Sequence, residues 1–123
     1  MNPVTEWARW YYEQGLNPLP SRGDRKGPAL ETYAHYRDGE RIPEAWLDRW
    51  PAPNCQVCLG VPWSLLVVDV DGPVAFRRWC DWNQQGRAWP ETWTVQSRRG
   101  LHYWYLIPPG VQACKSRVLW PVW

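Results

Sequence analysis

A ten-residue segment in the middle of the chain, SLLVVDVDGP at 64–73, constrains the fold more than any other segment. Its apolar run of leucine and valine has the length and β-branched content of a buried strand. Asp69 and Asp71 follow two positions apart, and alternate residues of a strand point to the same face. The chain must therefore fold around a strand that ends in two like charges on one face.

The two aspartates repel each other if they are removed from water. A rise of roughly 3.3 Å per residue separates them by about 6.6 Å, and at an effective dielectric near 20 the repulsion is about 2.5 kcal/mol. Arginines or a divalent metal could offset it, and hard carboxylate oxygens suit Mg²⁺ or Mn²⁺ held together with substrate phosphates. The alternative is a solvated strand end that leads into a turn at Gly72-Pro73, and the motif alone leaves both interpretations open.

A basic hairpin later in the chain favours the metal interpretation. The strands expected at 91–97 and 101–107 are joined by a tight turn with exposed backbone N–H groups, made by Ser97, Arg98, Arg99 and Gly100. His102 follows two residues after the glycine. Together, a carboxylate pair, a basic turn and a histidine supply what metal-dependent nucleotidyl transfer needs, since metals activate the attacking hydroxyl and cationic groups stabilise the phosphates.

The remaining segments predict an α+β fold with a mainly antiparallel sheet and helices packed on it, in one domain over residues 1–123. The first helix is expected from Pro3 to Gly15, with Val4, Trp7 and Tyr11 as its apolar stripe. The other expected helices lie at 42–50 and 72–86, and the other expected strands at 55–61 and 64–70. The twelve tryptophans are expected to fill the core.

Charge and hydropathy narrow the classes of partner. Residues 95–123 carry Arg98, Arg99, Lys115 and Arg117 but no acidic residue, although the net charge of the chain is only +2. This local positive field favours phosphate or nucleic acid as a partner. The chain has neither a bilayer-length apolar run nor a signal-peptide pattern at its N-terminus, so we expect a soluble, cytoplasmic protein without a membrane partner.

The cysteines do not predict a zinc site. Cys55 and Cys58 have the spacing of half such a site, but the second pair is missing. A strand through this segment would also place the two thiols on opposite faces. We therefore expect free, mostly buried thiols in a reducing compartment.

The order of these segments resembles the bifunctional DNA primase/polymerase domain, a branch of the archaeo-eukaryotic primase superfamily found in plasmid and phage replication proteins. The resemblance covers most of the chain. It rests on the helix ending in Gly15, NPLP, RKGP, EAWLDRW, VCLGV, the strand into Asp69-Val70-Asp71, and SRRGLH. It implies a primase/polymerase core with an RRM-like unit.

By this resemblance, Asp69 and Asp71 match the family's metal-binding aspartates, with Mg²⁺ or Mn²⁺ as the cofactor. His102 matches a histidine that contacts the phosphates of the incoming nucleotide, and Ser97–Gly100 match the turn before it. Lys26 matches a recurrent lysine of the early loop. The implied substrates are nucleoside triphosphates and a single-stranded DNA template with its primer, and a helicase domain or partner would accompany them.

One feature departs from the family pattern. The family uses a third carboxylate on a strand beyond the histidine, whereas this sequence has no acidic residue after Glu91. The apolar segment 116–123 is typical of the start of a strand. We therefore expect the domain to be incomplete at its C-terminus.

Two other functions remain as alternatives. The missing carboxylate favours a non-catalytic module that binds nucleotides or single-stranded nucleic acid through its basic hairpin and exposed tryptophans. The VVDVDG segment also resembles the first motif of haloacid-dehalogenase-like phosphatases, in which Asp69 would be the nucleophile and Asp71 the general acid. That motif normally lies near the N-terminus and lacks a proline at the position of Pro73.

Overall fold

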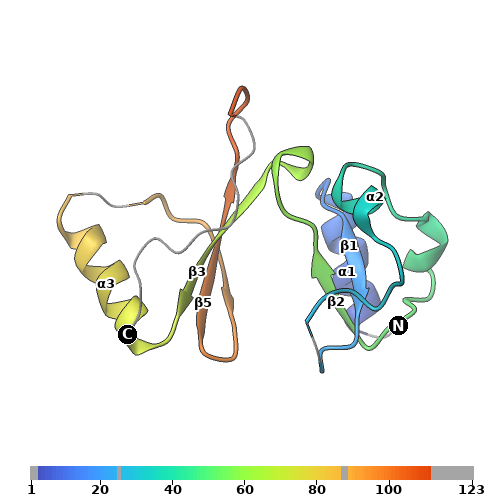
Figure 1. Ribbon diagram of the computed structural model, residues 1–123, viewed down its shortest axis with the longest axis horizontal. Helices are drawn as coiled ribbons and strands as arrows, with labels where there is room; N and C mark the ends of the chain where they lie inside the picture. The colour runs from blue at the N-terminus through green and yellow to red at the C-terminus, as the bar shows by residue number, and fades with distance from the viewer. Residues whose placement is uncertain (1–2, 25, 87–88, 112–123) are drawn as a thin grey trace. The chain divides into compact units, whose positions relative to one another are not determined.

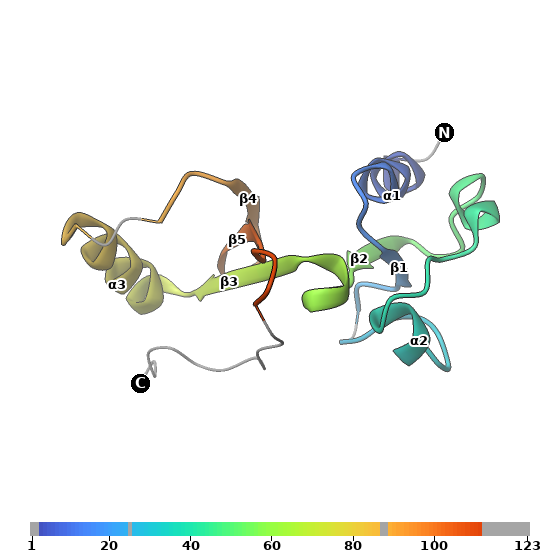
Figure 2. The same ribbon diagram turned by 90° about the horizontal axis from the view of Figure 1, so that it is seen from above.

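The computed structural model describes residues 3–24, 26–86 and 89–111, and the chain divides into two compact units at residue 64. We call residues 1–64 the N-terminal unit and residues 65–123 the C-terminal unit. Figures 1 and 2 show helices and antiparallel strands in both units. The predicted α+β class with antiparallel pairing is confirmed, although the described strands form two sheets rather than one.

The N-terminal unit consists of a helix, a two-stranded ribbon and short helical turns. Its elements are α1 (Pro3–Glu13), β1 (Pro18–Ser21), α2 (Ala34–Arg37), the 3₁₀ turn η1 (Glu44–Leu47), β2 (Asn54–Val57) and the 3₁₀ turn η2 (Val61–Trp63). β1 pairs antiparallel with β2. The expected helix at 42–50 is only the single turn η1, because Pro43 precedes it and Pro51 follows it closely.

Helix α1 has the predicted bounds but buries a different face. It begins at Pro3 and is followed by Gly15 at φ +86°, a left-handed conformation that favours glycine. The expected stripe contributes only in part, since Val4 packs against the core but Trp7 is 56% exposed. Thr5 and Ala8 are buried instead. Small side chains on this face allow close packing of the helix against the rest of the unit.

The core of the N-terminal unit is small and depends on polar side chains for its shape. Its buried members are Ala8, Leu19, Ile42, Leu47, Trp50, Cys58 and Trp63. Beside them, Asn17 is completely buried, and its side chain accepts a hydrogen bond from the Ile42 N–H (3.0 Å). The same side chain donates to the carbonyls of Tyr36 (3.2 Å) and Glu40 (2.9 Å). One asparagine therefore holds three backbone positions of the loop region.

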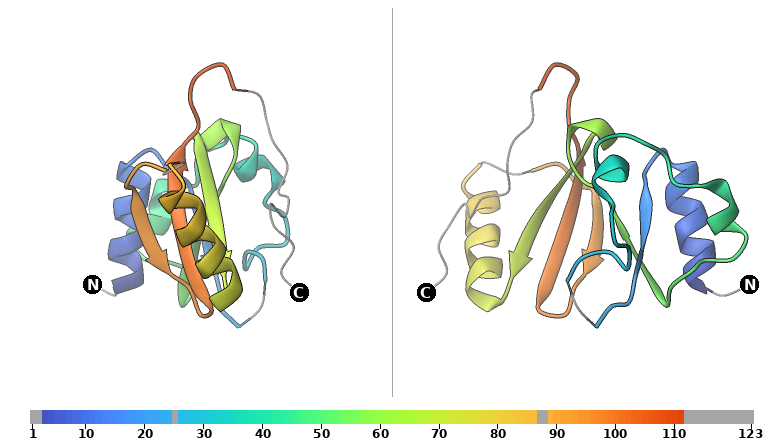
Figure 3. Two further views of the ribbon diagram at one scale, coloured as in Figure 1. Left: turned by 90° about the vertical axis from the view of Figure 1, so that its left-hand side faces the viewer. Right: turned by 45° about the vertical axis from the view of Figure 1, so that its right-hand side comes forward.

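Over its described residues, the C-terminal unit forms a three-stranded antiparallel sheet with one helix. β3 (Leu65–Asp71), α3 (Pro73–Gln84), β4 (Trp93–Gln96) and β5 (Gly100–Leu106) give the strand order β3-β5-β4. Helix α3 covers one face of this sheet (Figure 3). The buried Trp79 of α3 stacks on Tyr103 of β5, with ring centroids 4.9 Å apart. Since strand residues alternate between faces, this contact defines which residues face the helix.

Three further expectations concern the C-terminal segment, the tryptophans and the membrane. The strand expected at 116–123, together with Cys114, lies outside the described residues. Tryptophans are divided between core and surface: Trp50, Trp63 and Trp79 are buried, whereas Trp7 and Trp93 are exposed. Over the described ranges, no helix has the length and apolar character needed to cross a bilayer.

Candidate functional site

The register of the sheet places the predicted site residues on one face of the C-terminal unit. Asp69 of β3 lies directly opposite His102 of β5, and Asp71 lies opposite Gly100. Directly paired residues of an antiparallel ladder share a face. Val70, between the two aspartates, is 4% exposed and points to the face covered by α3. Both carboxylates and the imidazole thus lie on the sheet face opposite α3.

Each aspartate is paired with a basic side chain. The Nε2 atom of His102 lies 3.3 Å from Oδ1 of Asp69, a contact that is ionic when the imidazole is protonated. The Nε atom of Arg99 lies 3.4 Å from Oδ1 of Asp71. All four side chains are at least one third exposed, so each pair contributes about 0–1 kcal/mol to stability. These pairs keep the acidic and basic groups adjacent while leaving them accessible.

The basic turn is a tight connection between β4 and β5. The Ser97 N–H donates to the Gly100 carbonyl (2.9 Å), and the Gly100 N–H donates to the Ser97 hydroxyl (3.1 Å). The sequence predicted exposed N–H groups that could bind phosphate. These two N–H groups instead make hydrogen bonds within the turn. The exposed side chains of Arg98 and Arg99 are among the groups of this turn that remain accessible to an anion.

Gly100 is required by a close backbone approach. A Cβ atom at this position would lie 1.8 Å from the carbonyl oxygen of Val70. In addition, the N–H of Gly72 donates to the Arg99 carbonyl (2.9 Å), which extends the contact beyond the last ladder pair. The glycine thus lets β5 and its arginine turn lie directly against the end of β3 that carries the aspartates.

The donor set fits a divalent cation that is shared with a substrate. Asp69 and Asp71 offer exposed hard oxygen atoms on one face, and Mg²⁺ is commonly held by one or two carboxylates together with substrate phosphates. Within the described ranges, no cluster of three or more His, Cys, Asp or Glu side chains could hold a metal ion.

Two tryptophans extend this face, and the sequence analysis did not single them out. Trp104 lies two residues beyond His102 on β5, and Trp93 of β4 is its direct partner, with ring centroids 6.4 Å apart. Trp93 is 48% exposed. The period of two from His102 to Trp104 is the sequence signal that could have placed Trp104 on this face.

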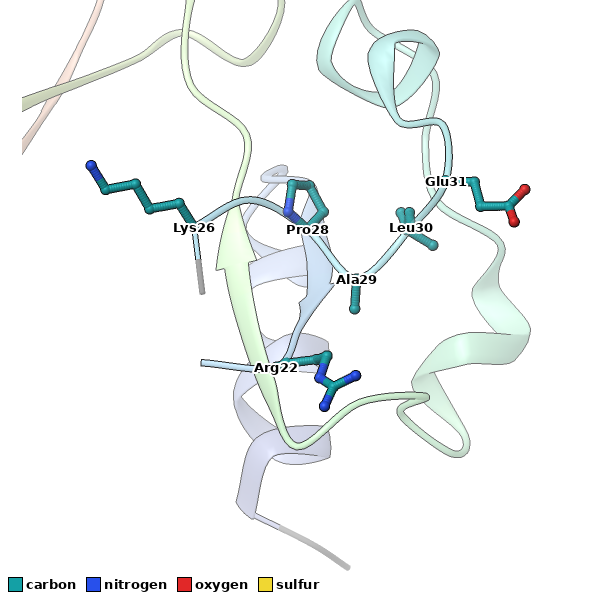
Figure 4. Close-up of a pocket in the computed structure, with 6 residues that line it drawn as sticks. All are labelled: Arg22, Lys26, Pro28, Ala29, Leu30 and Glu31. Carbon is teal, nitrogen blue, oxygen red and sulfur yellow. The ribbon is translucent and has the colours of Figure 1, made fainter. Parts of the chain in front are cut away.

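Lys26 belongs to a separate pocket of about 550 Å³ in the N-terminal unit. The pocket is lined by Arg22, Lys26, Pro28, Ala29, Leu30 and Glu31. Figure 4 shows that the Lys26 and Arg22 side chains point in different directions. Arg22 also pairs with Asp24 at 3.6 Å. The two cations therefore do not converge on one anion.

Cys55 and Cys58 contact the same small core, contrary to the opposite faces expected from a continuous strand. The reason is that β2 ends at Val57, so that Cys58 lies beyond the strand. Burial raises the pKa of each thiol to about 11. Both are therefore protonated at neutral pH.

Comparison with known families identifies the chain. The sequence model of the N-terminal domain of bifunctional DNA primase/polymerases matches residues 8–119. The chain belongs to this family. No curated protein and no solved structure matches it. The match includes Asp69, Asp71 and His102, so the primase/polymerase family assignment covers the sheet face described above, and it leaves the phosphatase alternative without support.

Family membership also sets the broad chemistry. Bifunctional primase/polymerases act in DNA replication, with nucleotides and DNA as their substrates, and they generally depend on divalent metal. Asp69 and Asp71 are exposed carboxylates that the described sheet presents on one face.

Proposed function

We propose that this primase/polymerase chain carries the nucleotidyl-transfer site, which joins nucleoside triphosphates to a primer on a single-stranded DNA template. The supporting observation is the β3–β5 register, which aligns Asp69 with His102 and Asp71 with the arginine turn on one exposed face. We place this activity in the cytoplasm, in plasmid or phage replication, with a helicase domain or partner.

The chain's own residues divide into two roles. Asp69 and Asp71 would hold Mg²⁺ or Mn²⁺, which when bound neutralises the triphosphate and makes the primer hydroxyl a better nucleophile. Arg98 and Arg99 bind phosphate oxygens, because a guanidinium group donates two parallel hydrogen bonds to such an anion. His102, when protonated, donates to a phosphate oxygen and stabilises charge on the leaving group.

The two ion pairs of the free protein place the basic side chains beside the carboxylates before a nucleotide binds. His102 and Arg99 are each held within 3.4 Å of a carboxylate. A cation held by Asp69 and Asp71 would replace His102 and Arg99 as their partner, and both basic side chains would then be available to phosphate oxygens. This exchange of partners keeps each charge neutralised before and after a nucleotide binds.

Substitution of the aspartates tests the proposal. Asp69→Asn and Asp71→Asn each remove a charge at nearly constant shape, and we expect Mn²⁺-dependent nucleotide binding to weaken by about tenfold or more. Titration calorimetry with a non-hydrolysable triphosphate, with Mn²⁺ and with chelator, measures the loss. Asp81→Asn on α3 is the matched control and should bind like the parent. Unchanged binding in both test variants would show that the carboxylates do not hold the metal.

One observation favours a second function, a non-catalytic module for single-stranded nucleic acid. Trp93 and Trp104 lie on the same face as His102, and exposed aromatic rings can stack on bases. This alternative predicts binding that weakens steeply with salt and does not respond to metal. Oligonucleotide titrations at several salt concentrations, with Mn²⁺ and with chelator, separate the two functions.

A further inference from the structure

The C-terminal unit also has a pocket, which lies on the sheet face opposite the carboxylates. It has a volume of about 380 Å³ and is lined by residues of α3, β4, β5 and the segment before β4. Its principal lining residues are Trp79, Asn83, Trp89, Glu91, Tyr103 and Tyr105. Tyr103 and Tyr105 alternate along β5 with His102 and Trp104, so this pocket is separate from the carboxylate site.

Four aromatic rings form a connected wall in this pocket. Trp79 stacks on Tyr103 at a centroid distance of 4.9 Å and an interplanar angle of 23°. Trp89 lies 5.7 Å from Trp79 and 5.1 Å from Tyr105, tilted against both rings. Rings held by such contacts are fixed in orientation, and their electron-rich faces attract cations.

The polar groups of the pocket are mostly engaged with the protein itself. The Asn83 side chain donates to the Trp79 carbonyl (2.7 Å) and accepts from the Trp89 N–H (2.9 Å). The Tyr105 hydroxyl donates to the Pro90 carbonyl (3.0 Å), and the Thr92 hydroxyl donates to the Trp104 carbonyl. These hydrogen bonds fix the wall and leave few groups for reading the edge of a nucleobase.

Among the described residues that line the pocket, Glu91 is the only charged one. The pKa of Tyr105 is raised by burial and by the nearby Tyr103 hydroxyl, so Tyr105 stays neutral at pH 7. The described lining of the pocket therefore combines aromatic faces with one carboxylate and contains no basic side chain. That combination attracts a positive ligand and repels a phosphate.

We infer that this pocket binds an organic cation, an ammonium or guanidinium group that lies against the aromatic wall and pairs with Glu91. The inference is independent of the proposed nucleotidyl transfer, because it uses none of the residues assigned to that reaction. A nucleotide or a single strand is the less suitable ligand, since its phosphates would meet Glu91 without a compensating basic residue among the lining side chains.

Ligand-observed NMR on the full chain tests the inference. Choline is compared with its neutral carbon analogue dimethylbutanol, and we expect choline to bind about tenfold more tightly, because a desolvated cation–π contact and a carboxylate add to the shared apolar burial. Arginine methyl ester, compared with a Gly-Arg-Gly peptide, reports the source of the cation. Tighter binding of the ester indicates a free small molecule, and tighter binding of the peptide indicates a side chain of a protein partner; both support the inference.

Two variants separate recognition from folding. Glu91 is exposed, so Glu91→Gln should fold normally and should reduce choline binding by about threefold, leaving a residual preference over the neutral analogue that the aromatic wall provides. Trp89→Leu should weaken choline binding more than it weakens dimethylbutanol binding. Glu31→Gln, in the N-terminal unit, is the matched control and should leave the binding of both choline and dimethylbutanol unchanged. Equal binding of choline and its analogue, full choline binding by Glu91→Gln, or preferential binding of AMP at this pocket would overturn the inference.

Discussion

The two units of the chain reach a defined structure by different means. The N-terminal unit has two four-residue strands, and its loops are held by buried side chains such as Asn17. The C-terminal unit has two seven-residue strands and one of four residues, paired through the backbone over nearly their full length. The difference teaches that a backbone ladder frees side chains for chemistry, whereas a loop-rich unit commits its polar side chains to structure.

Asn17→Ala is expected to have the largest effect on the stability of the N-terminal unit. The substitution leaves the Ile42 N–H and the carbonyls of Tyr36 and Glu40 without their buried partner. We expect the free energy of unfolding of the N-terminal unit to fall by about 3–4 kcal/mol. Each buried polar group left unsatisfied costs about 1–3 kcal/mol, and these costs are not fully additive. Hydrogen exchange measured by NMR localises the loss.

A second asparagine serves as the control for this prediction. Asn83 also bonds two backbone groups, at the end of α3, but it is more exposed than Asn17. Asn83→Ala should therefore cost about 1 kcal/mol. If both substitutions destabilise the protein equally, the N-terminal unit does not depend on buried polar side chains in the way described.

A smaller effect is expected from Gly100→Ala, which acts on the ladder itself. The added methyl would collide with the Val70 carbonyl oxygen, so β5 must move from β3, at a cost of about 2–3 kcal/mol. Gly86→Ala is the control, because its Cβ would meet open space and only its φ of +78° is unfavourable, a cost of about 1–2 kcal/mol. Urea unfolding compares the two variants, and equal costs would show that the close approach is unimportant.

The smallest effect at neutral pH is expected from the two thiols of the N-terminal unit, whose influence on stability changes only at alkaline pH. Burial raises the pKa of Cys55 and Cys58 from 9.0 to about 11. The unfolded chain ionises these thiols near pH 9 while the folded chain keeps them protonated, so their contribution to stability is complete below pH 9 and is lost as the pH rises toward 11. Thermal unfolding should be measured between about pH 8 and pH 11. The melting temperature of the Cys55→Ala, Cys58→Ala double variant should fall less steeply with pH than that of the parent.

Cys80→Ala supplies the reference for this measurement. Cys80 lies on α3, outside the N-terminal unit. Its replacement should leave the alkaline slope of the N-terminal unit unchanged. A slope that is the same in the double variant and the parent would contradict the assignment of the pH dependence to Cys55 and Cys58.

The parts of the fold that the sequence predicts correctly depend on local signals. The bounds of α1 follow from Pro3 and Gly15, and the hairpin follows from the SRRG turn between two apolar strands. The helix after Asp71 begins at Pro73, as expected from a proline near a helix start. Each of these signals lies within a few residues of the structure it determines.

The parts that the sequence leaves open depend on contacts between distant segments. The pairing of Asp69 with His102 requires the register of β3 on β5, which no local pattern specifies. The burial of Asn17 likewise depends on loops more than twenty residues away. Thr5 and Ala8 form the buried face of α1 because the packing of the unit favours small residues there, against the apolar stripe of the sequence.

The hydrogen bond from Gly72 to the Arg99 carbonyl has a mechanical consequence. Gly72 immediately precedes helix α3, so the arginine turn and the first turn of that helix share a short covalent and hydrogen-bonded connection. A substitution that shifts the backbone of the turn would therefore also disturb the first turn of α3. Trp79 and Asn83 lie on the same helix, so continuous secondary structure links the arginine turn to the aromatic pocket.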